Sequence, residues 1–260
     1  MRKPGPLVVS FGGGVNSAAM LIGLYERDIR PDLILFADTG GEKPETYAFL
    51  ETMRTWTVRN MDLGIVTVCA SKKTAPTLEA SCLRLGVLPS IVYGFRTCSQ
   101  RWKIEPQEKY LNTWQPARDC WQRGSQVRKA IGIDAGEPQR AKILTDVKAL
   151  SWFPLIEWGW ARPECVEAIQ RARLPVPVKS ACFFCPSSKK REVLELRRDH
   201  PDLFARAVAM ERNADASNKS VTGLGRHWSW DSIARADDAQ FKMFPEAVET
   251  PCMCFDGEPE

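Results

Sequence analysis

Three consecutive glycines near the start of the chain constrain its fold more than any other feature. They stand in SFGGGVNS (residues 10–17), between an apolar run, LVVSF at 7–11, and a segment with helical periodicity. Glycine reaches positive φ angles and lets a ligand approach the main chain. A glycine turn between a strand and a helix also presents backbone N–H groups at the positive end of the helix dipole. The pattern therefore predicts an anion-binding turn, usually a phosphate site.

Two further apolar runs follow the turn, at 32–37 (DLILFA) and 64–69 (GIVTVC), and a helical segment begins between them at about Pro44. Continuous apolar runs are typical of parallel strands that are buried on both faces. We expect Asn16 or Ser17 to cap the first helix. The alternation of strands and helices predicts an α/β fold with a doubly wound, mostly parallel, Rossmann-like sheet.

The last third of the chain lacks this alternation. Helices are expected at 163–173 and 189–212, the second broken at Pro201, and proline spacing in RLPVPVK (173–179) indicates a connector. We expect a nucleotide-binding domain at 1–175, with a smaller helical region at 176–260 that carries cysteines and packs on it.

Nine cysteines and two histidines restrict the chemistry of this 260-residue chain. No apolar run reaches the roughly 18 residues of a membrane span, and the first residues lack the pattern of a signal peptide. We therefore expect a cytoplasmic protein with no membrane partner. Cytosolic thiols stay reduced, which favours metal ligands, nucleophiles or core residues over disulfides. The net charge of +4 only weakly indicates a polyanionic partner.

The glycine turn resembles the S-G-G-x-D-S loop of the PP-loop ATP pyrophosphatases, which holds the β- and γ-phosphates while the α-phosphate is attacked. Gly12 and Asn16 stand where that family usually has Ser and Asp. Asn16 lacks the carboxylate that can hold Mg²⁺ at this position. Whether Mg²⁺ is a cofactor is therefore left open. The resemblance implies nucleotide contacts from the turn: Ser10, Gly12, Gly13, Gly14, Asn16 and Ser17.

A more specific resemblance is to phosphoadenosine phosphosulfate (PAPS) reductases and their relatives. FADTGGEKPETYAFLE (36–51) is similar to their D-T-G-x-E-x-P-E-T-x-x-F segment, and three further segments match in order: RTCSQRWKIEPQEKYL (96–111), GIDAGEPQR (132–140) and FPLIEWGWARPECVEAI (153–169). Asp134 stands where this family usually has Arg. The resemblance implies that ATP or a PAPS-like adenine nucleotide is bound by Asp38, Thr39, Gly40 and Glu45, with catalytic roles for Arg96, Cys98 and Lys103.

A C-x-x-C pair in SACFFCPSSKKREVLELRR (180–198) can present two thiolates to one metal centre. The resemblance makes Cys98 a third ligand beside Cys182 and Cys185. The fourth is Cys254, with Cys120, Cys252 or no protein ligand as alternatives. We favour a [4Fe–4S] cluster over zinc, while plain thiols remain open because free cysteine is often a buried apolar residue. Cys69, Cys82 and Cys165 are expected to be such residues.

Residues 171–198 are rich in Lys and Arg, with only Glu192 and Glu195 as acids. Such a segment attracts phosphate groups or is simply a solvated helix face.

Three functions remain open. The first is ATP-dependent sulfur transfer to a nucleic acid, a nucleotide or a small molecule. The second is a PAPS or APS reductase that releases sulfite through a cysteine nucleophile, although the C-terminal E-C-G-x-H motif of reductases is missing. The third is a non-catalytic nucleotide-binding accessory protein, to which the departures at Gly12, Asn16 and Asp134 point. A homodimer is one open alternative for the oligomeric state.

Overall fold

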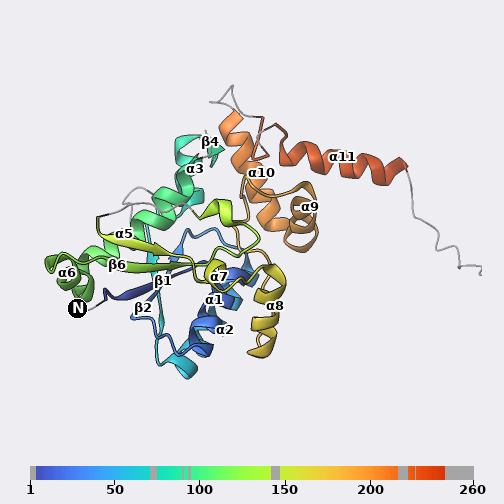
Figure 1. Cartoon of the computed structure of the whole chain (residues 1–260). Helices are drawn as coiled ribbons and strands as arrows, with labels where there is room; N and C mark the ends of the chain where they lie inside the picture. Colours follow the sequence, from blue (N-terminus) through green and yellow to red (C-terminus); the bar gives the residue numbers. More distant parts are fainter. Residues whose placement is uncertain are drawn as a thin grey trace, which may run out of the picture.

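A five-stranded parallel sheet forms the centre of the protein (Figure 1). The computed structural model describes residues 4–70, 75–89, 91–92, 95–141, 147–215, 222–225 and 227–243. The strand order is β3-β2-β1-β6-β7, and every neighbouring pair is parallel. The five strands are β1 (Leu7–Phe11), β2 (Leu33–Asp38), β3 (Ile65–Cys69), β6 (Val127–Ile131) and β7 (Ala149–Trp152). The predicted doubly wound sheet is confirmed, and the three predicted strands end within one residue of their expected bounds.

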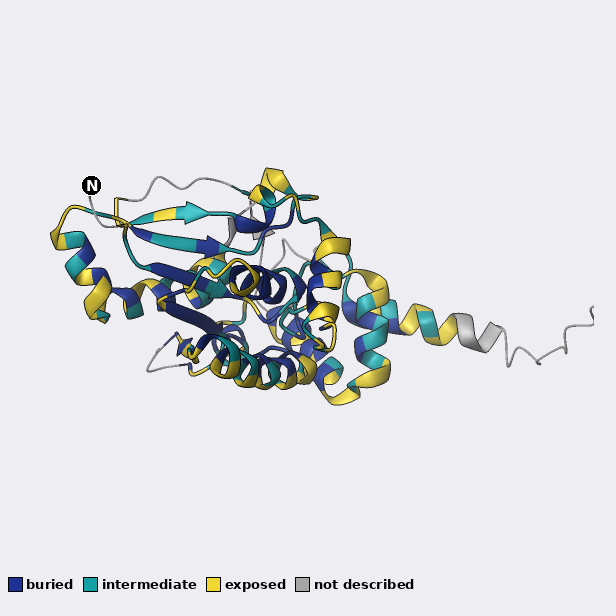
Figure 2. Ribbon diagram, turned by 60° about the horizontal axis from the view of Figure 1, so that its bottom comes forward, coloured by how far each residue is buried: buried dark blue, intermediate teal, exposed yellow. Residues whose placement is uncertain are grey.

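Helices cover both faces of this sheet because side chains alternate along each strand. Val9 and Phe11 of β1 pack with α1 (Val15–Glu26), α2 (Pro44–Met61), α7 (Pro154–Glu157) and α8 (Arg162–Arg171). Val8, between them, packs on the other face with α5 (Glu105–Thr113) and α6 (Gln115–Gln122). The central strands β1 and β2 and most of α1 are therefore buried, whereas β3, β6 and β7 are partly exposed; buried segments are dark blue in Figure 2. In the described ranges, no helix is long and apolar enough to cross a membrane.

The cap of α1 differs from the expectation. The helix begins at Val15, and its N-cap is Gly14, in extended conformation with φ −113° and ψ 177°. Ser17 lies inside the first turn, where its Oγ donates to the Gly14 carbonyl at 3.0 Å and accepts from the Gly14 N–H at 3.3 Å. The prediction of Asn16 or Ser17 as the cap is wrong because the turn is shorter than expected, and glycine is itself an acceptable N-cap.

The C-terminal helices form a separate core with α3. That core joins Trp102 and the adjacent Phe183 and Phe184 to helices that follow them. As expected, the chain breaks before Pro201, and residues 174–180 contain neither helix nor strand. The elements of this part of the molecule are α3 (Leu78–Leu85), β4 (Ile91–Val92), β5 (Phe95–Arg96), α4 (Thr97–Ser99), the π-helical turn η1 (Gln100–Ile104), the 3₁₀ turn η2 (Pro138–Arg140), α9 (Lys190–Asp199), α10 (Pro201–Asp215) and α11 (Trp230–Met243).

The C-x-x-C loop docks on the turn between β2 and α2. Glu42 and Cys182 form an antiparallel β-bridge, and the Phe183 N–H donates to the Gly41 carbonyl at 2.8 Å. Two segments about 140 positions apart in the sequence are thus brought together at the carboxyl end of β2.

Candidate functional site

The glycine turn lies at the point where the sheet changes its direction of winding. Gly12–Gly14 follow β1, and Gly132 follows β6, the neighbouring strand from the other half of the sheet. A Cβ on Gly132 would lie 3.0 Å from the backbone of Asn16 and Ser17, so the two loops are in direct contact. Gly13 has a φ of +73°, and a Cβ on it would lie 2.9 Å from Thr46 Cγ2. Ligands of open α/β sheets bind at such a switch point.

Two residues that depart from the family pattern contact each other there. Asn16 Nδ2 donates to Asp134 Oδ2 at 2.7 Å. The other carboxylate oxygen of Asp134 accepts from the Gly136 N–H at 2.9 Å, and Arg162 Nη1 donates to Asn16 Oδ1 at 3.4 Å. Only 6% of Asp134 is exposed. The carboxylate that the sequence lacks at position 16 therefore stands beside it, on the loop that follows β6.

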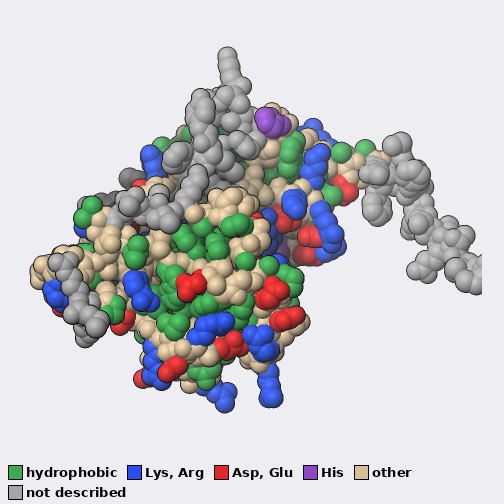
Figure 3. Space-filling view, in the orientation of Figure 1, with side chains coloured by type: hydrophobic (Ala, Val, Ile, Leu, Met, Phe, Trp, Pro, Cys, Tyr) green, Lys and Arg blue, Asp and Glu red, His purple; other side chains and the backbone are tan. Residues whose placement is uncertain are grey.

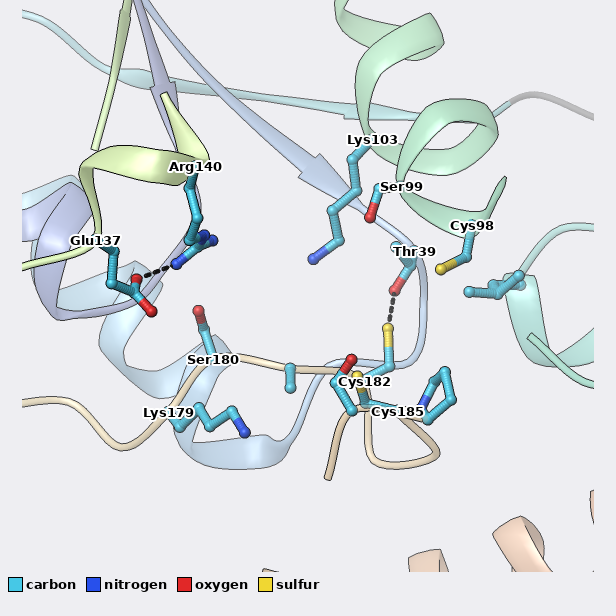
Figure 4. Close-up of a pocket in the computed structure, with 14 residues that line it drawn as sticks. Thr39, Cys98, Ser99, Lys103, Glu137, Arg140, Lys179, Ser180, Cys182 and Cys185 are labelled. Carbon is cyan, nitrogen blue, oxygen red and sulfur yellow. Dashed lines mark hydrogen bonds and ion pairs between the residues drawn. The ribbon is translucent and has the colours of Figure 1, made fainter. Parts of the chain in front are cut away.

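A cavity of about 470 Å³ gathers sulfur and positive charge beside this turn. Figure 4 shows Cys98, Cys182 and Cys185 at one end of it, Arg140 and Lys179 at the other, and Lys103 and Ser99 reaching in from η1 and α4. Three thiols and three cationic side chains, from the α4–η1 stretch, from η2 and from the loop at 179–185, therefore share one cavity. Its remaining lining residues are Thr39, Leu78, Glu137, Ser180, Ala181, Pro186 and Ser187.

Ser180 joins the cavity to the glycine turn. It lines the cavity, and its Oγ would lie 2.7 Å from a Cβ on Gly14, the N-cap of α1. An anion held by the backbone amides of the turn would therefore lie close to the cationic end of the cavity.

The Cys182 thiol is held by two neighbours from the β2–α2 turn. Its Sγ lies 3.1 Å from Thr39 Oγ1 and 4.0 Å from Glu42 Oε1. Burial, and next the Glu42 carboxylate, raise the pKa of this thiol to about 12. Cys182 is therefore protonated at neutral pH in the unliganded protein, since both effects disfavour the thiolate.

Glu42 also holds Lys103 in the cavity. Lys103 Nζ lies 2.7 Å from Glu42 Oε1, and the Glu42 side chain is completely buried. Burial lowers the pKa of Lys103, but the Glu42 carboxylate outweighs that effect and the pKa is raised. The second carboxylate oxygen, Glu42 Oε2, has no hydrogen-bond partner among the residues that the structure describes. Glu42 was not among the site residues predicted from the sequence, although it is the glutamate of the matched D-T-G-x-E segment.

The donor set of the cavity suits a thiophilic metal centre. Cys98, Cys182 and Cys185 all line it, and thiolate sulfur is the ligand that iron–sulfur clusters and structural zinc prefer. Within the described residues, no three His, Cys, Asp or Glu side chains are close enough to hold a single metal ion. Cys120 packs with Val127 on another face of the sheet and does not line the cavity. Cys252 and Cys254 lie outside the described residues.

Other predicted nucleotide contacts have partners within the protein. Asp38 Oδ1 accepts from the Gly40 N–H at 2.7 Å and from the Tyr47 hydroxyl at 2.8 Å, and burial and Asp38 raise the pKa of Tyr47. Gly40 has a φ of +69°. Glu45 Oε1 lies 2.5 Å from His200 Nε2, in a separate cavity of about 140 Å³.

Two further predicted residues belong to strands, Ser10 to β1 of the main sheet and Arg96 to the separate β4–β5 pair. Ser10 Oγ donates to Gln107 Oε1 at 2.9 Å. Arg96 belongs to β5, where its backbone pairs with Ile91, and its side chain lies outside the described residues.

The cysteines expected to be core residues divide into two groups. Cys82 and Cys165 are buried, and burial raises the pKa of each to about 12. Cys69 is exposed at the end of β3, so its prediction is wrong. The reason is its position as the last residue of β3, which is an edge strand of the sheet.

The basic segment at 171–198 is largely neutralised by nearby acids. Lys, Arg, Asp and Glu side chains are interspersed on the face seen in Figure 3. This pairing favours an ordinary solvated face over a phosphate-binding patch. The ion pairs of the segment are Arg171–Glu26, Lys179–Glu192, Arg191–Glu195, Arg197–Asp238 and Arg198–Asp199.

The parallel sheet and its glycine turn define an α/β protein of the PP-loop class. Residues 6–176 match the phosphoadenosine phosphosulfate reductase domain, and the chain belongs to that family. An argininosuccinate synthase from Brevibacillus brevis is 22% identical over 173 residues, which are 66% of this chain and 39% of that protein. The chain thus spans about two fifths of the length of that relative.

One solved structure with a related arrangement is the U34-tRNA thiolase NcsA from Methanococcus maripaludis with its [4Fe–4S] cluster. It is 16% identical in sequence and has a TM-score of 0.43, over 84% of this chain and 75% of that one.

Proposed function

We propose that the protein is an ATP-using sulfur-transfer enzyme that carries a [4Fe–4S] cluster. The observation that supports this most directly is the single cavity of about 470 Å³, because it combines three thiols with three cations next to the glycine turn. Neither the glycine turn nor the group of thiols suggests this function by itself. A turn without thiols would fit any nucleotide-binding protein, and thiols without an anion site would fit a structural metal centre.

The turn and the cations have complementary roles in this proposal. Backbone N–H groups of Gly12–Gly14 hold the phosphates, and Lys103, Arg140 and Lys179 neutralise charge as it develops. An acceptor oxygen bonds to the α-phosphorus while the bond to the pyrophosphate leaving group breaks. A sulfur donor then displaces AMP from the activated carbon. The role of the cations in this proposal is electrostatic rather than acid–base, and each is also paired with an acid, Glu42, Glu137 or Glu192.

The proposed cluster ligands are Cys98, Cys182 and Cys185, with Cys254 as the fourth. When bound, such a cluster supplies a metal site for the sulfur atom. Thr39 and Glu42 fix the Cys182 side chain toward the cavity. Residues 1–175 are proposed as the nucleotide-binding domain and residues 176–260 as a region packed on it, because α9, α10 and α11 share a core that is distinct from the sheet.

A second candidate is a PAPS or APS reductase, which family membership favours. It requires a reactive thiolate that attacks the sulfonate sulfur, forms an S–S bond and releases the adenosine phosphate, before sulfite leaves on reduction. The raised pKa of Cys182 counts against that thiol as the nucleophile.

The two candidates are separated by their products. Protein purified without oxygen would be assayed for iron and acid-labile sulfide, for pyrophosphate release from ATP with candidate acceptors, and for sulfite release from PAPS. Pyrophosphate release by an iron-containing protein supports sulfur transfer, whereas sulfite release supports the reductase.

The ligand assignment has its own test. Cys182→Ala and Cys185→Ala should each lose iron, whereas Cys165→Ala, a buried thiol that does not line the cavity, should retain it. Full iron content in both cavity variants would contradict the assignment.

A further inference from the structure

We propose that Asn16 and Asp134 act as one unit, in which Asp134 is a positioning residue that fixes the nucleotide turn through the Asn16 side chain. The inference rests on the proposed function, since it assumes that the turn holds a nucleotide. It also assigns a role to two residues whose types, taken separately, favoured a protein that had lost its activity.

The contact between the two side chains is the first observation. They are 118 positions apart in the sequence, yet Asn16 Nδ2 lies 2.7 Å from Asp134 Oδ2. Both depart from the family pattern, which would place Asp and Arg at these positions. Two unrelated losses need not fall on side chains that touch. The pair still joins a carboxylate to a hydrogen-bond donor, but the carboxylate now comes from the β6 loop.

The surroundings of Asp134 are the second observation. The residue is 6% exposed, and among the described residues its carboxylate oxygens accept hydrogen bonds from Asn16 and from the Gly136 N–H. A buried carboxylate is costly unless its hydrogen bonds are made. The hydrogen bond from the Asn16 amide therefore stabilises the Asp134 carboxylate in its buried position. Arg162 contacts the opposite side of the same amide at 3.4 Å, so Asn16 is held from both sides.

The Asn16–Asp134 contact affects the glycine turn because the loops that follow β1 and β6 lie close together. Asn16 is the second residue of α1, two residues after the N-cap Gly14. A Cβ on Gly132 would lie 3.0 Å from the Asn16 carbonyl group, so the backbones cannot separate without exposing buried surface. The Asp134–Asn16 bond ties the first turn of α1 to β6, and thereby fixes the direction of the amides at Gly12–Gly14.

Exchanging the two side chains tests the unit. Asn16→Asp sets two carboxylates face to face and should weaken ATP binding by about tenfold or more, since like charges at this range disfavour each other. In Asn16→Asp/Asp134→Asn, the amide and the carboxylate change places and the bond can form again. That variant should bind ATP within about threefold of the wild type. Asn112→Asp, at an exposed site bonded to Lys148, controls for the added charge and should leave binding unchanged.

ATP affinity would be measured by calorimetry, and thermal unfolding would be followed on the ligand-free protein. The proposal is overturned if the exchanged variant binds ATP no better than Asn16→Asp does. It is also overturned if the exchanged variant fails to fold. Loss of binding in Asn112→Asp also overturns it, because net charge would then explain the effect. If the wild type binds neither ATP nor PAPS, the proposed function fails, whereas the unit is still tested by unfolding. There, destabilisation in Asn16→Asp and recovery in the exchanged variant support it, and no recovery refutes it.

Discussion

Replacing Lys103 by methionine should destabilise the protein because it leaves the Glu42 carboxylate buried without its cation. Lys103 Nζ lies 2.7 Å from Glu42 Oε1, and the exposed fractions of the two side chains are 36% and 0%. Within the described part of the chain, Glu42 Oε2 already has no hydrogen-bond partner. Removing one partner of a fully buried ion pair costs about 3–5 kcal/mol, whereas an exposed pair contributes about 0–1 kcal/mol. Since Lys103 is one-third exposed, we expect Lys103→Met to cost about 2–3 kcal/mol.

The partner substitution should be milder. Glu42→Gln removes the charge that burial disfavours and leaves Lys103, which reaches solvent and keeps its hydration. Its cost should be about 1 kcal/mol, the ordinary contribution of one hydrogen bond. In Glu42→Gln/Lys103→Met no buried charge remains, so the double variant should be more stable than Lys103→Met alone. The order of stability among the variants therefore depends on whether the buried Glu42 carboxylate or the partly exposed Lys103 ammonium is left without its partner.

Urea unfolding of the reduced, ligand-free protein, followed by circular dichroism, measures all three variants on one scale. The slope of the transition must stay the same for the comparison to hold. A cost for Lys103→Met equal to or below that of Glu42→Gln would refute the reasoning, because the buried carboxylate would then not depend on its cation. A double variant less stable than Lys103→Met would refute it as well.

Three further predictions concern the turn, an acid and a core thiol. Gly13→Val should abolish nucleotide binding in calorimetry and lower stability by about 2 kcal/mol or more, since a side chain is strained at positive φ and meets Thr46. Gly12→Ala, whose Cβ has nothing nearer than 3.8 Å, should remain stable, and equal losses in both would contradict this account. Burial raises the pKa of Glu192, but the bond from Lys179, the bond from the Lys189 N–H and the charges of Lys179 and Lys43 together outweigh this, and the pKa lies below its ordinary value of 4.5. Its stabilisation is thus present above pH 4.5 and lost as the pH falls through the lowered pKa, so Glu192→Gln and the wild type should differ in denaturant midpoint at neutral pH and converge in acid. A constant difference would show that the carboxylate charge is not responsible. Cys165 is fully buried, and burial raises its pKa to about 12, so iodoacetamide at neutral pH should label it only after denaturation, as mass spectrometry would show, and rapid labelling of the folded protein would contradict its burial.

Local pattern was enough to predict the elements that frame the site. The runs at 7–11, 32–37 and 64–69 became β1, β2 and β3, because strands buried on both faces need continuous apolar sequence. Pro201 ends a helix wherever the chain goes next, since proline cannot continue the hydrogen-bond ladder. The glycine turn was equally readable, because positive φ at Gly13 is a property of the residue itself.

The sequence pattern did not correctly predict the N-cap of α1 or the exposure of Cys69. A cap depends on where the chain leaves the strand, and a pattern places that point only within a residue or two. Cys69 ends an apolar run, but it belongs to an edge strand of the sheet, where its side chain is left uncovered. Both errors come from the positions of element ends, where neighbouring parts of the fold decide the outcome.

The sequence by itself determined the parallel sheet, the anion-binding turn and the residue types of the site, because these follow from periodicity and from the chemistry of single side chains. Only the tertiary structure decided which of them meet. It paired Lys103 with Glu42, which was not predicted, and brought Asp134 into contact with Asn16. These contacts depend on how the loops at the carboxyl ends of the strands pack, and distance along the chain carries no information about that.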